Sequence, residues 1–82
     1  MKYDLYSKVA LANDIEGTIF KKGDIGTVVE YLEPPEKNAQ PGYCLEMFDA
    51  YSNTVDVIVV PESSIITIPK NSLITYREYE LA

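Results

Sequence analysis

The chain has 82 residues, 46% of them hydrophobic, and its thirteen acidic and seven basic side chains give a formal net charge of −6 at pH 7. Such a chain forms one small folded domain, because it has room for a single core and too much apolar content for disorder. The negative charge disfavours generic DNA or RNA binding, and the single cysteine excludes an internal disulfide. No apolar run is long enough for a membrane helix and the first residues do not resemble a signal peptide, so we expect a cytoplasmic protein.

The first part of the chain predicts two strands joined by an ordered loop. A short strand is expected over residues 7–12, where Val9 and Leu11 alternate with other residues and form one buried face. Residues 13–24 are rich in turn formers and predict a loop pinned under the sheet. The side chains expected to pin it are Ile15 and either Ile19 or Phe20. Residues 25–32 are rich in β-branched side chains and give the strongest strand signal in the chain.

An exposed loop and a third strand follow. Residues 33–42 contain a double proline that cannot donate to a sheet ladder, and the rest of the segment is polar, so it predicts a solvated loop. Residues 43–48 predict a strand with alternating faces. The first face carries Tyr43, Leu45 and Met47, and the second carries Cys44, Glu46 and Phe48.

A fourth strand over residues 54–60 is expected to pair with the third through a tight turn at residues 49–53, in which Asn53 can take a left-handed conformation. The side chains of this strand expected to face the core are Val55, Val57 and Val59. This assignment places Ile58 and Val60 on the opposite side, as an apolar strip beside Phe48 that one small barrel cannot cover.

The last part of the chain predicts a short strand and a tail. Residues 61–64 suit a single 3₁₀ turn, and residues 65–68 predict a fifth strand before Pro69. The tail, residues 70–82, is either a sixth strand or a short helix, because its apolar residues do not settle the period. It is expected to dock on the barrel or on a neighbouring chain.

Five short antiparallel strands without a long helix predict an all-β fold, and a chain this short hides its sheet edges best by curling. The order of strands and loops matches a small SH3-like barrel. We therefore expect an SH3-like β-barrel domain over residues 1–69, with residues 70–82 as a C-terminal extension that is docked or involved in oligomerisation.

The segment from Lys22 to Glu30 carries the most specific local chemistry. Gly23 can supply a positive φ, Asp24 can accept from nearby backbone amides, and Gly26 lets another strand approach closely. This structural turn resembles the one that leads into a strand in SH3-like barrels, including ribosomal and transcription-factor modules.

Roughly residues 7–68 resemble the small bacterial family called domain of unknown function 4926, through the same turn, the opening apolar strand and the strand that follows the loop. The chain departs from that family at Ser52-Asn53, in the proline-rich loop and in the tail. The resemblance implies a fold and a bacterial setting, and it carries no catalytic residue.

The reactive residue types form no diagnostic pattern, so we expect no enzyme activity, cofactor or metal. The glycines of the turn lead into a strand, whereas phosphate-binding loops precede a helix. The acidic pairs Asp14/Glu16 and Glu33/Glu36 have too few ligands for a calcium loop. Cys44 has no histidine partner and is expected to be an inert, buried or half-buried thiol.

Seven tyrosines in a chain without tryptophan are the one excess. Tyrosine is enriched at protein interfaces, although it also fills strands. The candidate interface residues are Tyr31, Phe48, Tyr51, Ile58, Val60, Tyr76 and Tyr79.

Two functions are consistent with these observations. The first is a non-catalytic protein-binding module, whose partner is another copy, forming a homodimer, or a small and perhaps basic bacterial protein in an antitoxin- or immunity-like role. The alternative is a nucleic-acid-associated SH3-like module that uses a local patch of Lys8, Lys21 and Lys22, although the overall charge opposes it.

Overall fold

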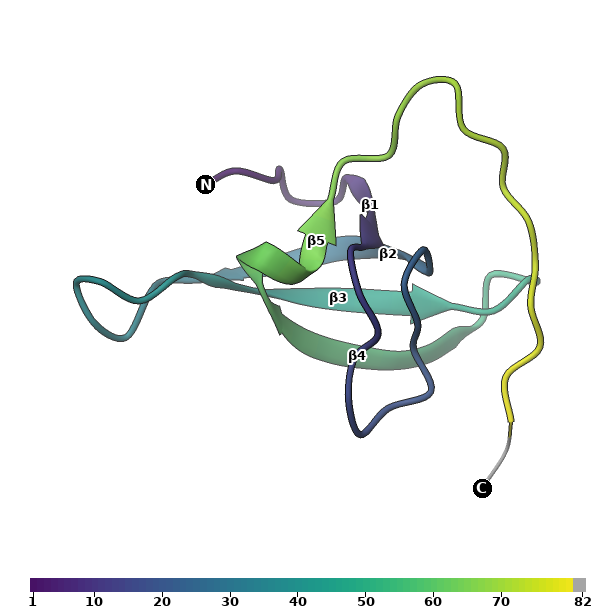
Figure 1. Cartoon of the computed structure of the whole chain (residues 1–82), viewed down its shortest axis with the longest axis horizontal. Coiled ribbons are helices and arrows are strands. Elements are labelled where there is room, and N and C mark those ends of the chain that lie inside the picture. Colours follow the sequence, from purple (N-terminus) through teal and green to yellow (C-terminus); the bar gives the residue numbers. More distant parts are fainter. Residues whose placement is uncertain (81–82) are drawn as a thin grey trace.

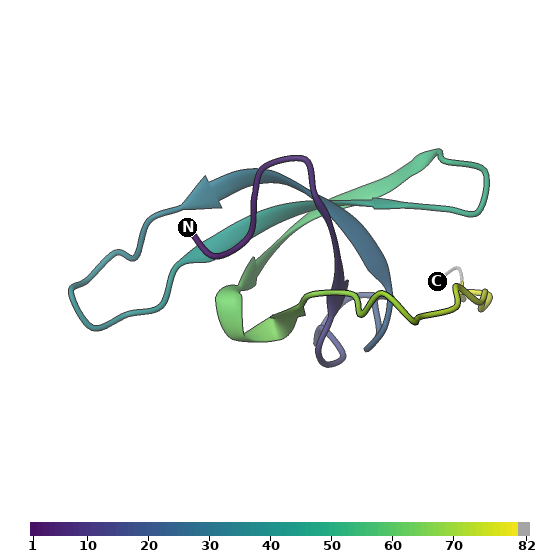
Figure 2. The same ribbon diagram turned by 90° about the horizontal axis from the view of Figure 1, so that it is seen from above.

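The computed structural model describes residues 1–80, which form one curled sheet of five strands (Figure 1). The strands are β1 (Lys8–Leu11), β2 (Ile25–Leu32), β3 (Gly42–Phe48), β4 (Thr54–Pro61) and β5 (Ile65–Ile66), with a 3₁₀ turn, η1 (Glu62–Ser64), between the last two. All neighbouring strands are antiparallel, in the order β4-β3-β2-β1-β5. Figure 2 shows the sheet bending strongly, as a half-barrel. The predicted all-β class with five short antiparallel strands is confirmed, and this strand order is compatible with the predicted SH3-like barrel.

The turn into β2 is built from the residues that the sequence singled out. Gly23 has a φ of 92°, and the Lys21 amide donates to the Asp24 carboxylate at 2.8 Å. At Gly26, an added Cβ would lie 2.5 Å from the Met47 sulfur and 3.2 Å from the Glu46 carbonyl oxygen, so a larger residue would force the buried Met47 side chain to shift.

The core lies on the concave side of the sheet. As predicted, Tyr43, Leu45 and Met47 are fully buried along β3. The other members of this core cluster are Tyr3, Val9, Leu11, Phe20, Val28, Ile58, Val60 and Ile65. The loop over residues 13–24 covers the open side through buried Phe20 and partly buried Ile15 and Ile19, which confirms its expected role.

Strand β1 is buried on both faces rather than on one. Val9 and Leu11 face the core as predicted, but Ala10 is also buried. The reason is that Ala10 pairs with Ile25 of β2 on one side and with Ile66 of β5 on the other, so two large side chains flank its methyl group.

The predicted facing of β4 is wrong over most of the strand. Ile58 and Val60 are buried, with exposed fractions of 7% and 1%, whereas Val57 and Val59 are 51% and 63% exposed. The cause is a bulge, since Thr54 pairs with Phe48 whereas Asp56 pairs with the preceding residue on β3. One extra residue in a strand moves every later side chain to the opposite face.

The turn that leads into β4 also differs from the prediction, in the residue that takes the left-handed conformation. Ser52, with a φ of 67°, takes the left-handed conformation in place of Asn53. The carboxylate of Asp49 accepts from the amides of Tyr51 and Asn53 at 2.9 Å each, and the Asp49 amide donates to the Asn53 carbonyl. These bonds fix Asn53 directly before β4, so the residue with the left-handed conformation is Ser52, one position earlier than predicted.

The end of the chain is less regular than the sequence predicts. The expected 3₁₀ turn is present, but the fifth strand pairs with β1 only at Ile65 and Ile66 and ends before the predicted residues 67 and 68. Residues 70–80 form neither the sixth strand nor the short helix that the sequence allowed, and they run along the outside of the barrel (Figure 1). The last two residues of the expected tail, 81–82, lie outside the described residues.

Candidate functional site

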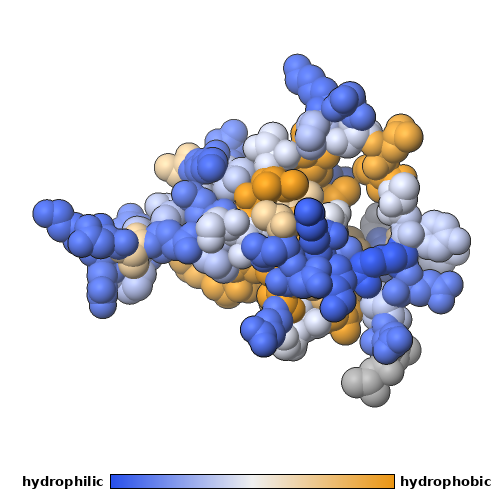
Figure 3. Space-filling view, viewed as in Figure 1, coloured by the Kyte–Doolittle hydropathy of each residue, from blue (hydrophilic) through white to orange (hydrophobic). Residues whose placement is uncertain are grey.

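The convex face of the sheet carries an exposed apolar strip on β3 and β4. Phe48, Val57 and Val59 are 40%, 51% and 63% exposed, and we call these three residues the outer strip. Figure 3 shows hydrophobic atoms along the lower edge of the molecule, where β4 runs in Figure 1. The sequence predicted an uncovered apolar strip beside Phe48, and the outer strip lies there. Because of the bulge, however, it is formed by other residues of β4 than those predicted.

Acidic side chains share this face with the outer strip. The strand register places Glu30, Cys44 and Val59 in one row across the sheet. The next row is formed by Thr27, Glu46 and Val57. Since cross-strand neighbours point to the same side, each exposed valine has a carboxylate in its row. The face therefore combines apolar contact area with negative charge.

The edge of β4 is partly protected against pairing with another strand. The Asp56 carboxylate accepts from the Val57 amide at 2.8 Å, and Pro61 ends the strand. Charges, prolines and bulges on an edge strand are the common means of blocking strand addition. The outer strip is consequently better suited to contact through its side chains than through its backbone.

A groove of about 380 Å³ adjoins the outer strip at Val59. It lies between β4 and the loop that connects β2 to β3. Its walls are largely apolar and include Leu32, Pro35, Pro41, Val59 and Pro61. The groove extends the outer strip toward the exposed loop, which gives this face both a flat and a hollowed part.

Cys44 lies on the same face, but its thiol is expected to be unreactive. Burial raises the pKa of its thiol, and the negative charge of Glu30 raises it further. A thiol whose pKa is raised stays protonated at neutral pH and is a poor nucleophile and metal ligand. The half-buried side chain thus matches the inert thiol that the sequence predicts.

The candidate interface residues do not form one surface. Tyr31 is half-buried on the concave side, where its ring packs edge-on against Tyr43 at 5.3 Å. Tyr51 is 88% exposed in the β3–β4 turn, and Tyr76 and Tyr79 lie in the tail. Of the residues predicted from β3 and β4, only Phe48 is exposed, because Ile58 and Val60 belong to the core.

Tyr43 ties the N-terminal segment to the barrel, a role that sequence reasoning missed. Its hydroxyl accepts from the amides of Lys2 and Tyr3 at 3.0 and 3.3 Å and donates to the Glu62 carboxylate at 3.0 Å. Burial raises the pKa of Tyr43 above its ordinary value. The Tyr3 hydroxyl in turn donates to the Ile65 carbonyl at 2.9 Å. These tyrosines hold the fold together and are not available for binding.

A second feature that the sequence did not predict is an arginine site at the turn into β2. The Arg77 guanidinium donates to both carboxylate oxygens of Asp24 and to the Ile19 carbonyl, with Nε–Oδ1 and Nη2–O distances of 2.9 and 2.7 Å. The Asp24 carboxylate raises the pKa of Arg77. No local signal marks this contact, because the two residues are 53 positions apart.

Lys21 of the predicted lysine patch pairs with Asp14 of one predicted acidic pair. Lys21 lies 3.9 Å from the Asp14 carboxylate, which also accepts from the Lys22 amide at 2.9 Å. Lys8 lies at the start of β1, whereas the turn containing Lys21 bonds to the other end of that strand at Leu11. Within residues 1–80, no three histidine, cysteine, aspartate or glutamate side chains gather as a metal site would require.

No family model, curated protein or solved structure matches the chain. In the part of the chain that the structure describes, no helix is long and apolar enough to cross a membrane. The candidate site is therefore characterised by its own geometry: an apolar strip among carboxylates, with a groove at one end.

Proposed function

We propose that this protein is a non-catalytic protein-binding module whose outer strip docks a basic partner protein. The observation that carries the proposal is the outward position of Phe48, Val57 and Val59, with exposed fractions of 40 to 63%. Three large apolar side chains on one face of a small domain favour a protein contact. The adjoining groove at Val59 adds a hollow that an apolar side chain of the partner fills.

The charge on and around this face selects the class of partner. Glu30 and Glu46 lie in the same rows as the exposed valines, Asp56 precedes them on β4, and the whole chain has a net charge of −6. Complementary charge steers association and rejects acidic competitors. A small basic protein that this chain neutralises, in an antitoxin- or immunity-like role, fits these properties. Membership in the bacterial family of domain of unknown function 4926 is part of the same proposal.

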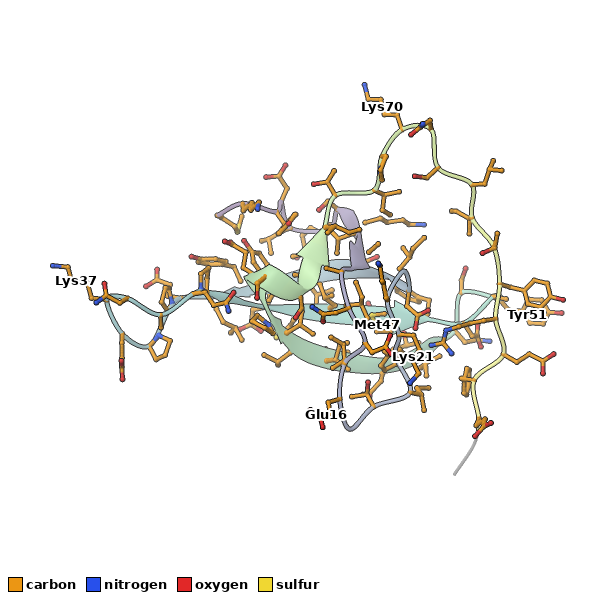
Figure 4. All side chains as sticks on the ribbon, in the orientation of Figure 1. Glu16, Lys21, Lys37, Met47, Tyr51 and Lys70 are labelled. Atoms are coloured by element: carbon orange, nitrogen blue, oxygen red, sulfur yellow. The ribbon has the colours of Figure 1, made fainter. Side chains whose placement is uncertain are left out.

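The nucleic-acid alternative gains no support from the positions of the basic residues. Lys21 pairs with Asp14, so part of its charge is already compensated. Figure 4 shows Lys21, Lys37 and Lys70 widely separated, with Lys37 at the tip of one loop and Lys70 in the tail. Binding to a phosphate backbone draws on several free cations that act together.

The proposal is tested by affinity purification from the native cell, followed by calorimetry with the purified partner. Val57→Glu combined with Val59→Glu is expected to weaken the complex by about thirtyfold or more, because it places charge at the centre of the contact. Asn71→Glu combined with Ser72→Glu is the control, since it adds the same two charges at exposed positions away from the outer strip and should leave the affinity unchanged. Recovery of nucleic acid alone, or a partner that binds the strip variant as tightly as the wild type, would contradict the proposal.

A further inference from the structure

The tail runs over the barrel without packing into it. Every residue from Pro69 to Glu80 is exposed, and the only backbone hydrogen bond within residues 69–80 joins the Ser72 amide to the Pro69 carbonyl at 3.2 Å. No backbone group of this segment bonds to a strand in the described part of the chain. A segment held so weakly along its length is free to take another path at little cost.

The specific anchor of the tail is a single arginine. The Arg77 guanidinium binds the Asp24 carboxylate through two nitrogens and also donates to the Ile19 carbonyl. Bidentate binding of this kind selects arginine over lysine, because only the planar guanidinium presents two donors to one carboxylate. Nearby, Tyr79 lines a cavity of about 570 Å³ together with the loop that carries Ile19 and with the start of β4.

The site that receives Arg77 is organised by the barrel and not by the tail. The Asp24 carboxylate also accepts from the Lys21 amide at 2.8 Å. The backbone of the same turn exchanges two hydrogen bonds with Leu11, at 2.8 and 2.9 Å, through Gly23 and Asp24. An arginine from any chain therefore meets a preformed carboxylate and carbonyl at this position.

The part of the tail before the anchor is apolar and uncovered. Leu73, Ile74 and Tyr76 are 92%, 78% and 86% exposed. Figure 3 shows hydrophobic atoms on the tail, standing apart from the body of the molecule. When the tail lies on its own barrel, these three side chains gain almost no burial, although burying a large apolar side chain is favourable by about 1.5–3 kcal/mol.

We propose that two copies of this chain exchange their tails, so that Arg77 of each copy occupies the Asp24 site of the other. Exchange keeps the anchor contacts unchanged and is a low-cost route to a dimer. The free energy gained on dimerisation comes from the burial of Leu73, Ile74 and Tyr76, which lie between the two barrels when the tails cross. The eight residue-to-residue steps from Pro69 to Arg77 reach about 27 Å when extended, which is enough to pass to an adjoining copy of a molecule whose shortest extent is 20 Å.

The exchange is independent of the outer strip. It uses the turn into β2 and the tail, whereas the proposed basic partner contacts Phe48, Val57 and Val59. Loss of one interaction therefore leaves the other measurable, and failure of either proposal does not decide the other.

Charge reversal separates exchange from docking within one chain. Light scattering of the eluting peak is expected to show a dimer for the wild type and a dimer weakened by about tenfold for Arg77→Asp, because the variant's monomer can release its tail, whereas its dimer must keep two tails ordered without their ion pairs. Asp24→Arg is expected to weaken the dimer likewise. An equimolar mixture of the two variants restores dimers, because both crossed contacts are then complementary. Lys70→Asp, which makes the same charge change in the same tail, should behave as the wild type.

A second measurement does not depend on altering the Asp24 turn. Chains that carry a spin label at Ser72→Cys, in a Cys44→Ser background, are mixed with isotope-labelled chains that carry no spin label. Line broadening of the Asp24 and Ile19 amides in the unlabelled chains supports exchange. A wild type that stays monomeric at high concentration, or the absence of broadening in the chains without a spin label, would overturn it.

Discussion

Removal of the Tyr43 hydroxyl tests how the barrel holds its N-terminal segment. Tyr43→Phe keeps the ring that packs between Tyr3 and Tyr31 and deletes only the oxygen. Three hydrogen bonds are lost, to the amides of Lys2 and Tyr3 and to the Glu62 carboxylate.

The magnitude follows from the exposure of each partner. Lys2 is exposed and Glu62 only half-buried, so water replaces most of what they lose. The residue Tyr3 is only 6% exposed, so its amide is left without a partner in a dry site. An unsatisfied buried group costs about 1–3 kcal/mol. We expect Tyr43→Phe to lower the free energy of unfolding by about 2 kcal/mol, which in a domain of this size lowers Tm by roughly 8–16 °C.

The pH dependence of the same group has a definite sign. Because burial raises the pKa of Tyr43 above its ordinary value of 10.0, the folded chain holds this proton where the unfolded chain has released it. The contribution to stability is complete below that value and is lost as the pH rises through the raised one. The wild type should thus lose stability more steeply than Tyr43→Phe in alkaline buffer.

Urea unfolding and amide exchange provide the assay. Tyr43→Phe should speed exchange of the Lys2 and Tyr3 amides, whereas Tyr51→Phe, which removes a hydroxyl from a side chain that is 88% exposed, should change stability by less than about 0.5 kcal/mol. Equal stability of Tyr43→Phe and the wild type, with no faster exchange, would refute this role of the hydroxyl.

Three further predictions concern the sheet. Gly26→Ala should lower the free energy of unfolding in urea by about 1–3 kcal/mol, because its Cβ would meet the Met47 sulfur; an unchanged midpoint would contradict the close approach. By the same assay, Ile58→Ala should lower the free energy of unfolding by about 2–5 kcal/mol and Val59→Ala by less than about 1 kcal/mol. A larger effect at Val59 than at Ile58 would support the facing of β4 that the sequence predicts. Asp49→Ala should destabilise the chain at neutral pH and have no effect in acid, since backbone amides lower the pKa of Asp49 and its contribution is lost as the pH falls through that lowered value; a difference that persists in acid would count against this.

Local patterns were sufficient for most of the strands. Residues 25–32 were predicted with the bounds that β2 has, because β-branched side chains and flanking turn formers act over a few residues. The faces of β3 followed from a clear alternation of apolar and polar residues. The turn at Gly23 and Asp24 was readable for the same reason, since its chemistry is contained in four consecutive residues.

The facing of β4 was not readable, because residues 57–60 are all apolar and fit either phase. The extra residue at the bulge is defined by pairing with Phe48 on β3, a relation between two strands that periodicity within one strand does not contain. As a result, the candidate strip was predicted at the correct place on the sheet but with Ile58 and Val60 in the positions that Val57 and Val59 occupy.

Contacts between distant parts of the chain were missed for a related reason. The bonds from the Lys2 amide to Tyr43 and from Arg77 to Asp24 join residues 41 and 53 positions apart. A single tyrosine or arginine gives no pattern that points to its partner. The excess of tyrosine was noticed, but only the fold separates Tyr3 and Tyr43, which build the core, from Tyr51, which is exposed.

Cysteine labelling along β4 tests the central claim, that the bulge turns Val57 and Val59 outward. In a Cys44→Ser background, Val57→Cys and Val59→Cys are predicted to react with a maleimide in native buffer almost as fast as in denaturant. Ile58→Cys and Val60→Cys should react at least about a hundredfold more slowly, because they become accessible only when the sheet opens. Fast labelling at positions 58 and 60 with protection at 57 and 59 would contradict the account and remove the outer strip on which the proposed function depends.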